Sequence, residues 1–385
     1  MKKKILIIGS FILPDKTASA IRVRGLAHIL NDIGYEVYFL GNNPYINGNN
    51  DFFYTDGYKC FYNKPNDFKS YYNIEREIQV IKQLNDGDLY SIIAYHEHSI
   101  KLIRLNRFCH KHGIKMICDQ TEWYSYKRQF KGFFTIKSID FLFRHYWVQK
   151  KIKNLIVISS YLESYFQKKK MHLARIPNVV FENYSYNNKV EISYKQMNGN
   201  NINYVYSGSN SKKELLEIGI NAFSILRTKS KNIVLHVLGL TKSDFIKRYT
   251  KNAQISLEGI VFYGKLERHN ALDILSKADF SIILRANERY AKAGFPTKMM
   301  ESLMVGTPII CNLIGDMKLY LKNNVNCIEI VNLSIKETYE AFTKSITISK
   351  KEIEKMKIMS FKTSNEELNY KYYINKMEKF LSEIK

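Results

Sequence analysis

The sequence lacks the features that mark several large classes of protein. It has only five cysteines in 385 residues, without CxxC spacing, which suits a reducing compartment and gives no metal site. It contains no run of 18 apolar residues, so we expect no membrane-spanning segment. The opening stretch MKKKILIIGSFILPD has an apolar run cut short by Pro14 and Asp15, so we expect no secretory signal. These absences favour a cytoplasmic protein.

Two ligand motifs are also missing. The loop after the first predicted strand, GSFILPDKTASAIR, contains no GxGxxG, so a nicotinamide dinucleotide fingerprint is absent. No DxD pair stands out in a loop suited to holding a divalent metal.

Acidic residues are few compared with basic ones. The chain has 36 Asp and Glu against 59 Lys and Arg, which gives a net charge of +23. Such a balance favours polyanions, anionic membrane surfaces or phosphorylated substrates as partners. The hydrophobic content of 45% excludes a disordered chain, and the length favours two domains.

Short apolar runs alternate with helical patterns in both halves of the chain. This alternation predicts two Rossmann-like, doubly wound α/β domains with parallel sheets. An Asn-rich stretch at 176–203 reads as the linker, so we place the domains at 1–177 and 178–363. Predicted strands cover 4–10, 36–41, 89–96, 114–120, 154–160, 202–209, 232–240, part of 255–264, 280–285 and 308–312. Because such sheets bind ligands beyond the carboxyl ends of their strands, two facing sheets would form a cleft.

Basic residues follow several of these strands. In YSGSNSKKELL a flexible turn leads to Lys212 and Lys213, which open a helix. A cation there is unfavourable without an anion, so a phosphate ligand and a plain surface pair are equally good interpretations. Arg285 ends the strand FSIILR and would point toward a ligand or pair with Glu288. Arg22, on the first helix, would face the cleft or solvent.

The stretch AGFPTKMMESLMVGTPIICN, from Ala293 to Asn312, is the strongest signal. Gly294 permits close approach of a ligand, and Pro296 suits the first position of a helix. Lys298 and Glu301 are three residues apart and share a helical face. The lysine and the free N–H groups of the helix could hold a diphosphate, and the glutamate could accept hydrogen bonds from ribose hydroxyls. A surface Glu–Lys pair is the alternative, and the apolar setting argues against it.

This stretch resembles the nucleotide-sugar site of retaining glycosyltransferases of family 4, which have the GT-B fold. The likeness is to the bacterial surface and capsular polysaccharide branch, and it covers almost the whole chain. Further segments that carry it are DQTEWY at 119–124, VISSYLESYF at 157–166 and YSGSNSKK at 206–213. The resemblance implies a metal-independent enzyme without cofactors that takes a nucleotide-sugar, with UDP as the expected nucleotide. It also implies that a terminal helix at about 364–385 packs back on the first domain.

The resemblance assigns roles to individual residues. Glu301 matches the family glutamate that binds the nucleotide ribose, whereas Ala293 stands where a second glutamate contacts the donor sugar, with Glu288 out of register. Lys213 matches the residue that neutralises the leaving diphosphate, with Arg285 and Lys298 as further catalytic cations. Ser209 stands where many members have an arginine. The expected donor-binding residues are Gly208, Ser209, Gly294, Phe295, Pro296, Thr297 and Glu301.

The acceptor is expected on the first domain. His96 follows one predicted strand, Asp119 and Glu122 follow another, and Arg22 lies on the first helix. The HEH triplet at 96–98 suggests a metal motif, but its spacing and the lack of a third ligand favour hydrogen bonding instead.

Residues 101–153 hold thirteen Lys or Arg against three Asp or Glu, interleaved with aromatics. This pattern favours contact with the inner face of the cell membrane and a glycan or lipid-linked acceptor, with a solvated basic helix as the alternative. Three functions stay open: a glycosyltransferase, a catalytically silent GT-B subunit suggested by Ala293, and a nucleic-acid-binding protein suggested only by charge and aromatics.

Overall fold

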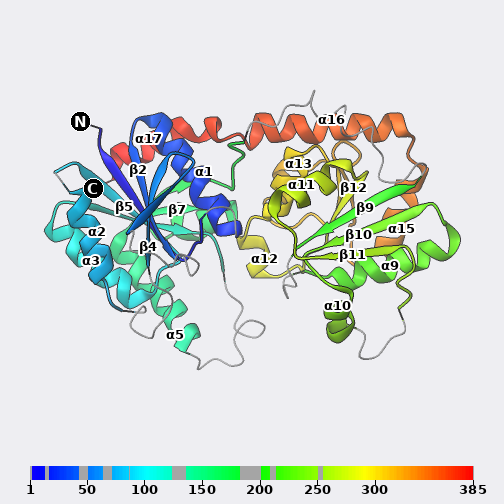
Figure 1. The fold of residues 1–385 in the computed structure, drawn as a ribbon, viewed down its shortest axis with the longest axis horizontal. Helices are drawn as coiled ribbons and strands as arrows, with labels where there is room; N and C mark the ends of the chain where they lie inside the picture. The colour runs from blue at the N-terminus through cyan, green and yellow to red at the C-terminus, as the bar shows by residue number, and fades with distance from the viewer. Residues whose placement is uncertain are drawn as a thin grey trace. The chain divides into compact units, whose positions relative to one another are not determined.

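The chain folds into two α/β units (Figure 1). A computed structural model describes residues 2–13, 17–42, 51–63, 72–85, 87–123, 136–182, 201–208, 214–249 and 255–384. The first unit comprises residues 1–181 together with 370–385, and the second comprises residues 182–369. The chain therefore enters the second unit at Glu182 and returns to the first at Tyr370, against sequence-based boundaries of 177 and 364.

The described part of the first unit contains an eight-stranded sheet in the order β3-β4-β2-β1-β5-β6-β7-β8. All neighbouring strands are parallel except β3 and β4, which form an antiparallel hairpin that is not among the predicted strands. The strands are β1 Lys4–Gly9, β2 Glu36–Asn42, β3 Phe52–Thr55, β4 Tyr58–Asn63, β5 Leu89–Tyr95, β6 Lys115–Gln120, β7 Asn154–Val157 and β8 His172–Arg175.

Helix α1 of the first unit begins and ends at local sequence signals. In α1, the Thr17 side chain accepts a hydrogen bond from the Ala20 N–H, and Gly34 ends the helix with φ 108°, a left-handed conformation that glycine adopts without strain. The helices are α1 Ala18–Ile33, α2 Glu75–Leu84, α3 Ser99–Lys111, α5 Ile136–Phe143, the π-helical η2 Arg144–Val148, α6 Gln149–Ile152, α7 Ser160–Gln167, the 3₁₀ turn η3 Tyr370–Tyr373 and α17 Ile374–Glu383.

The described part of the second unit contains a six-stranded parallel sheet in the order β11-β10-β9-β12-β13-β14. The strands are β9 Ile202–Ser207, β10 Ile233–Leu238, β11 Ile260–Gly264, β12 Phe280–Ile283, β13 Ile309–Cys311 and β14 Cys327–Glu329. The helices are α9 Leu216–Lys229, α10 Lys242–Tyr249, α11 Arg268–Lys277, α12 Arg289–Ala293, α13 Thr297–Met304, α14 Met317–Tyr320, α15 Ile335–Thr347 and α16 Lys350–Glu367.

Each unit has its own apolar core. In the first, Ile5 and Ile7 of β1, Ile93 of β5 and Phe380 of α17 belong to one buried cluster. In the second, a buried aromatic group joins β9 to α9 and α15, with the ring of Tyr204 5.1 Å from that of Phe342. Where the chain is described, no helix is both long and apolar enough to cross a bilayer.

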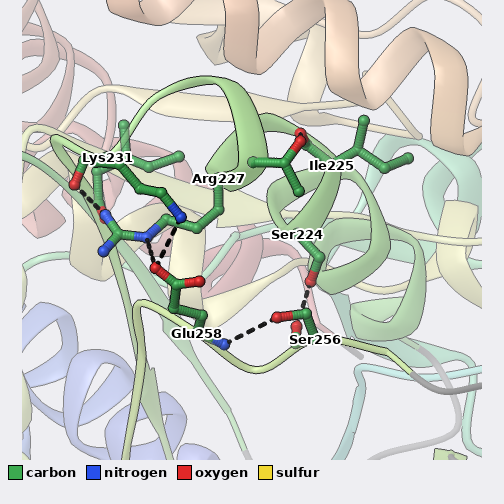
Figure 2. A network of polar contacts seen from close by, with 8 residues as sticks. Ser224, Ile225, Arg227, Lys231, Ser256 and Glu258 are labelled. Carbon is green, nitrogen blue, oxygen red and sulfur yellow. Dashed lines mark hydrogen bonds and ion pairs between the residues drawn. The ribbon is translucent and has the colours of Figure 1, made fainter.

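A polar network ties the end of α9 to the β10–β11 connection in the second unit (Figure 2). Glu258 forms ion pairs with Lys231 at 2.9 Å and with Arg227 at 3.5 Å. The guanidinium of Arg227 also donates to the carbonyl of Ile233 at 2.9 Å. Gly259 has φ +75°, and a Cβ there would lie 2.8 Å from Nε of Arg227, so this turn requires glycine. The network holds one end of the sheet, away from the candidate site described below.

The single terminal helix expected at about 364–385 is divided in the structure. Helix α16 ends at Glu367. The next two residues, Leu368 and Asn369, separate it from η3 and α17, which belong to the first unit. The break lies where the chain leaves the second unit for the first. The expectation that the terminal helix packs on the first domain holds for α17, since Met377 and Phe380 are in that core.

Replacing Phe380 with Ala should lower the free energy of unfolding of the first unit by about 3–5 kcal/mol, because a large buried ring leaves a cavity. Phe380 is 2% exposed and stacks on His172 of β8 with the ring centroids 4.6 Å apart. Both tryptophans, Trp123 and Trp147, lie in the first unit, so urea denaturation followed by their fluorescence reports on it alone. The control is Tyr372→Ala, which removes a ring that is 61% exposed. Equal losses in both variants would contradict the core role of α17.

Candidate functional site

The candidate site lies at the carboxyl ends of β9 and β12. These strands are neighbours in the second sheet, and the connections from them lead to opposite sides of the sheet. Doubly wound sheets bind ligands at such a reversal of strand order. Gly208 directly follows β9, and Arg285 lies two residues beyond β12. An isolated antiparallel bridge between Glu214 and Arg285 joins the two strand ends.

The segment from 289 to 312 provides one wall of this site. Helix α12 ends at Ala293, Gly294 to Pro296 form the connection, and α13 begins at Thr297 with Pro296 as its N-cap residue. The predicted helix start was therefore one residue early. Phe295 is buried with its ring edge-on to Tyr320, with the centroids 5.7 Å apart, and so anchors the turn. The first turn of α13 contains no acidic residue, so its N-terminal partial positive charge is available to an anion.

Lys298 occupies a compact polar cluster. Its ammonium forms an ion pair with Oε2 of Glu214, and the same oxygen accepts a hydrogen bond from the Tyr206 hydroxyl. The ammonium also lies 4.2 Å from the centre of the Tyr206 ring, a cation–π contact. Burial lowers the pKa of Lys298, and the Glu214 carboxylate opposes that shift. The expected diphosphate-binding lysine is therefore already neutralised by a carboxylate that the sequence analysis did not identify.

Glu301 has a different partner. Its Oε1 accepts a hydrogen bond at 3.1 Å from Nε of Arg268, and the guanidinium of Arg268 also reaches Glu182 at 2.7 Å. Burial raises the pKa of Glu301, whereas the nearby guanidinium lowers it. Lys298 and Glu301 share a helical side as predicted, but each is paired with a residue from another element. The predicted ribose-binding carboxylate is thus held in place by Arg268.

Arg285 is fixed through its backbone. Its N–H donates to Oδ1 of Asn312 at 2.9 Å, and its carbonyl accepts from Nδ2 of Asn312 at 2.7 Å. The side chain is 7% exposed and lies toward Gly294, where an added Cβ would be 3.6 Å from one guanidinium nitrogen. Arg285 also contributes to lowering the pKa of Lys298, as expected for two cations near each other. Arg285 and Lys298 are therefore both at the switch point of the sheet.

Two positions that bear on the expected sugar contact, Ala293 and Glu288, lie at opposite ends of α12. Ala293 is fully buried at the end of α12, and Glu288 is exposed at the other end of the same helix as its N-cap residue. The side chain of Glu288 is therefore a poor replacement for a glutamate at 293. Ser209 and Lys213 lie outside the described residues.

On the first unit, the roles expected for Arg22 and Asp119 need correction. The two side chains form a buried bidentate ion pair, with nitrogen–oxygen distances of 2.8 and 3.0 Å and exposures of 3% and 0%. Arg22 also donates to the carbonyls of Ile176 and Pro177 at 2.7 and 2.6 Å. Its donors therefore hold α1, β6 and the end of the first unit together, and we assign the pair a structural role in place of acceptor binding.

The HEH triplet is split among three partners. Nε2 of His96 lies 2.6 Å from Oγ1 of Thr121, Glu97 is buried with Lys101, and His98 lies 3.5 Å from Asp140. Within the described ranges, no three His, Cys, Asp or Glu side chains are grouped as a metal would require. His96 has φ +53°, a strained conformation for a histidine, and such strain clusters at functional sites.

Glu122 lies just beyond β6, and its carbonyl accepts a hydrogen bond from the Gln120 side chain. Its side chain is only partly buried. Among the predicted acceptor residues, His96 and Glu122 therefore retain that expectation.

Four residues of the site were missed by the sequence analysis: Tyr206, Glu214, Arg268 and Asn312. Arg268 could have been found, because it is the first residue of α11, and a cation at a helix N-terminus is unfavourable without an anionic partner. Lys212 and Lys213 show the same pattern in the sequence. Glu214 carried no comparable signal, since its partner Lys298 is 84 residues away.

Comparisons with known proteins bear on the family and the fold of this chain. Residues 190–360 match the model of the family described as Glycosyl transferases group 1. That range contains the Lys298–Glu214 and Glu301–Arg268 pairs. No curated protein matches the chain by sequence.

Several solved structures resemble the whole chain. Sucrose-phosphate synthase from Thermosynechococcus elongatus has a TM-score of 0.70 at 12% identity, covering 99% of this chain and 98% of that one. A glycosyltransferase from Rickettsia africae gives 0.69 at 13%, covering 100% and 98%. Anabaena HepE in complex with UDP-glucose gives 0.67 at 11%, covering 99% of both. The chain therefore has the GT-B fold, as the sequence predicted.

Replacing Asp119 with Asn should lower the free energy of unfolding of the first unit by about 3–5 kcal/mol, because Arg22 would stay buried without its counterion. Chemical denaturation monitored by tryptophan fluorescence measures this loss. The matched control is Glu163→Gln, whose partner Arg175 lies at 2.9 Å in a pair that is 28% and 31% exposed. That variant should lose at most about 1 kcal/mol. A stable Asp119→Asn protein that has lost only activity would restore the acceptor-binding role.

Proposed function

We propose that this protein is a retaining glycosyltransferase. In this proposal it moves a sugar from a nucleotide-sugar, with UDP as the nucleotide, to a glycan or lipid-linked acceptor in bacterial surface polysaccharide biosynthesis. The observation that carries the proposal is the grouping of Lys298, Arg285 and the N-terminus of α13 at the switch point of the second sheet. The family match over residues 190–360 and the fold shared with a structure that holds UDP-glucose support it.

The proposed chemistry explains why cations gather at this edge. The bond between the sugar C1 and the diphosphate oxygen breaks, and negative charge develops on the leaving β-phosphate. Lys298, Arg285 and the free N–H groups of α13 would stabilise that charge. A bond forms between C1 and the acceptor oxygen on the same face, and the acceptor proton passes to the leaving phosphate. No separate base is then needed, and we propose that no divalent metal takes part.

Glu301 would bind the ribose hydroxyls of the donor. Its carboxylate has a second oxygen besides the one bonded to Arg268, and a carboxylate accepts several hydrogen bonds. Arg268 would keep this group ionised and oriented. The donor would then be held at its ribose by Glu301 and at its diphosphate by the cations.

A thermal-shift screen tests the proposal most directly. The purified protein is mixed with UDP, GDP, CMP, ADP, NAD or a short DNA duplex, and the midpoint of unfolding is compared with that of the free protein. Saturable stabilisation by one nucleoside diphosphate supports the donor site. Stabilisation by DNA alone would overturn it in favour of nucleic-acid binding. Donor binding without transfer to any acceptor would favour the silent subunit.

Glu301→Ala and Lys213→Ala should each lower the rate of sugar transfer by about 100-fold or more, because each removes a group that binds the donor or the developing charge. Release of the nucleoside diphosphate is the measured quantity. Glu217→Ala, which changes an exposed glutamate of α9, is the matched control and should keep the wild-type rate. Thermal denaturation checks that all three variants are folded. Wild-type rates in the Glu301 variant would remove it from the donor site.

We further propose that helix α5 and η2 contact an anionic membrane surface. Ile139, Phe143, Tyr146 and Trp147 are 54%, 39%, 39% and 58% exposed, an unusual density of apolar side chains on one short segment. Lysines border them, with Lys151 4.9 Å from the Trp147 ring and Lys169 5.0 Å from the Tyr146 ring. Aromatic side chains bordered by cations suit the interface of anionic lipids. Residues 124–135 of the predicted segment lie outside the described residues.

Trp147→Ser should weaken binding to vesicles containing phosphatidylglycerol by about tenfold. A large apolar side chain that moves from water into the lipid contributes about 1.5–3 kcal/mol to the binding free energy. Cosedimentation with vesicles measures the bound fraction, and vesicles of phosphatidylcholine alone show the contribution of lipid charge. Val331→Ser, which changes a side chain that is 74% exposed in the second unit, is the control. Equal binding by wild type and the Trp147 variant would exclude this surface.

A further inference from the structure

Glu214 has an unusual position for a carboxylate. It lies at the carboxyl edge of the second sheet, where the proposed function requires the negative charges of the donor. Its backbone bridges to Arg285, and its side chain, 18% exposed, contacts Lys298 and Tyr206. A single oxygen, Oε2, receives both the ammonium and the phenol hydroxyl. The two donors therefore converge on one anionic oxygen.

A phosphate oxygen could take the same two interactions. Ammonium and phenol donors bind carboxylate and phosphate oxygens in the same way, since both are anionic acceptors. Lys298 also rests over the Tyr206 ring, which keeps the ammonium at this place. A lysine side chain that is only 16% exposed would be unfavourable without an anion beside it, so Lys298 needs a counterion within the protein. Glu214 supplies it.

Gly208 leaves space for this arrangement. A Cβ added at residue 208 would lie 2.7 Å from Cε of Lys298 and 3.0 Å from the Glu214 carboxylate. Even alanine would therefore displace one of the two side chains. The strand end, the glycine and the carboxylate together hold Lys298 where an incoming anion at the β9–β12 edge would meet it.

We infer that Glu214 is a placeholder for the donor diphosphate: it neutralises Lys298 in the unliganded protein and is displaced when the diphosphate binds. This inference rests on the proposed function, because it assigns Lys298 to the diphosphate. The ion pair between Glu214 and Lys298 must break before the diphosphate can bind, and this reduces the apparent affinity for the diphosphate. The same requirement also disfavours ligands that lack a charge to replace the carboxylate. Glu214 is thus a residue that sets ligand selectivity.

The test is isothermal titration of wild type, Glu214→Gln and Glu217→Gln with inorganic pyrophosphate, UDP and uridine. Glutamine keeps the size of the side chain and removes the competing charge. Glu214→Gln should bind pyrophosphate and UDP about tenfold more tightly than wild type, with no change for uridine. Glu217→Gln, an exposed neighbour on α9, should match wild type. Unchanged or weaker pyrophosphate binding by Glu214→Gln, or none by either protein, would overturn the inference.

A variant that already lacks the ion pair distinguishes displacement of Glu214 from Lys298 from simple repulsion between Glu214 and the incoming anion. In Lys298→Gln the ion pair is gone, so adding Glu214→Gln should restore little affinity. A gain of the same size in that background would show that Glu214 acts through its charge alone and would also overturn the inference. The proposed function fails separately, when pyrophosphate binds but no nucleoside diphosphate of any base does.

Discussion

The parallel pairing of β9 with β12 is the constraint on which the candidate site depends. Parallel strands end at the same edge of a sheet, so residues far apart in the chain meet there. Gly208, Glu214, Arg285 and α13 are all brought to one place by this pairing. The same edge gathers two cations, and their charges then determine which other side chains can be there. The Glu214 carboxylate balances the charge of Lys298. The Asn312 side-chain amide holds the backbone of Arg285 in place.

Charge balance is equally decisive in the first unit. Arg22 and Asp119 lie on α1 and at the end of β6, and their pairing removes both charges from solvent. The sequence placed Asp119 at a strand end and Arg22 on the first helix, and both positions also occur among ligand-binding residues. Burial distinguishes the two roles: a side chain that uses its donors on Ile176 and Pro177 has few left for a ligand.

Local signals in the sequence were enough to predict much of the fold. The alternation of apolar runs predicted the parallel sheets, and α1 ends at Gly34, whose φ of 108° suits glycine. The hairpin of β3 and β4 was missed because its strands are only four and six residues long. The terminal helix was predicted as continuous because its apolar periodicity continues across Leu368. In the site, the motif around Lys298 and Glu301 was identifiable, but its pairing with Glu214 and Arg268 was not. Glu214 is 84 residues from Lys298 and Arg268 is 33 from Glu301, so only tertiary structure brings them together.

The return of the chain to the first unit also bears on how the protein is made. Met377, Phe380 and Leu381 are part of the first core, although the first unit otherwise ends at Phe181. During synthesis the amino-terminal part emerges from the ribosome long before these residues exist. Its apolar surface against α1 and β8 must therefore stay uncovered while the whole second unit is translated. Folding of the second unit can proceed independently in that interval, whereas the first is completed last, so the order of completion is the reverse of the order of synthesis.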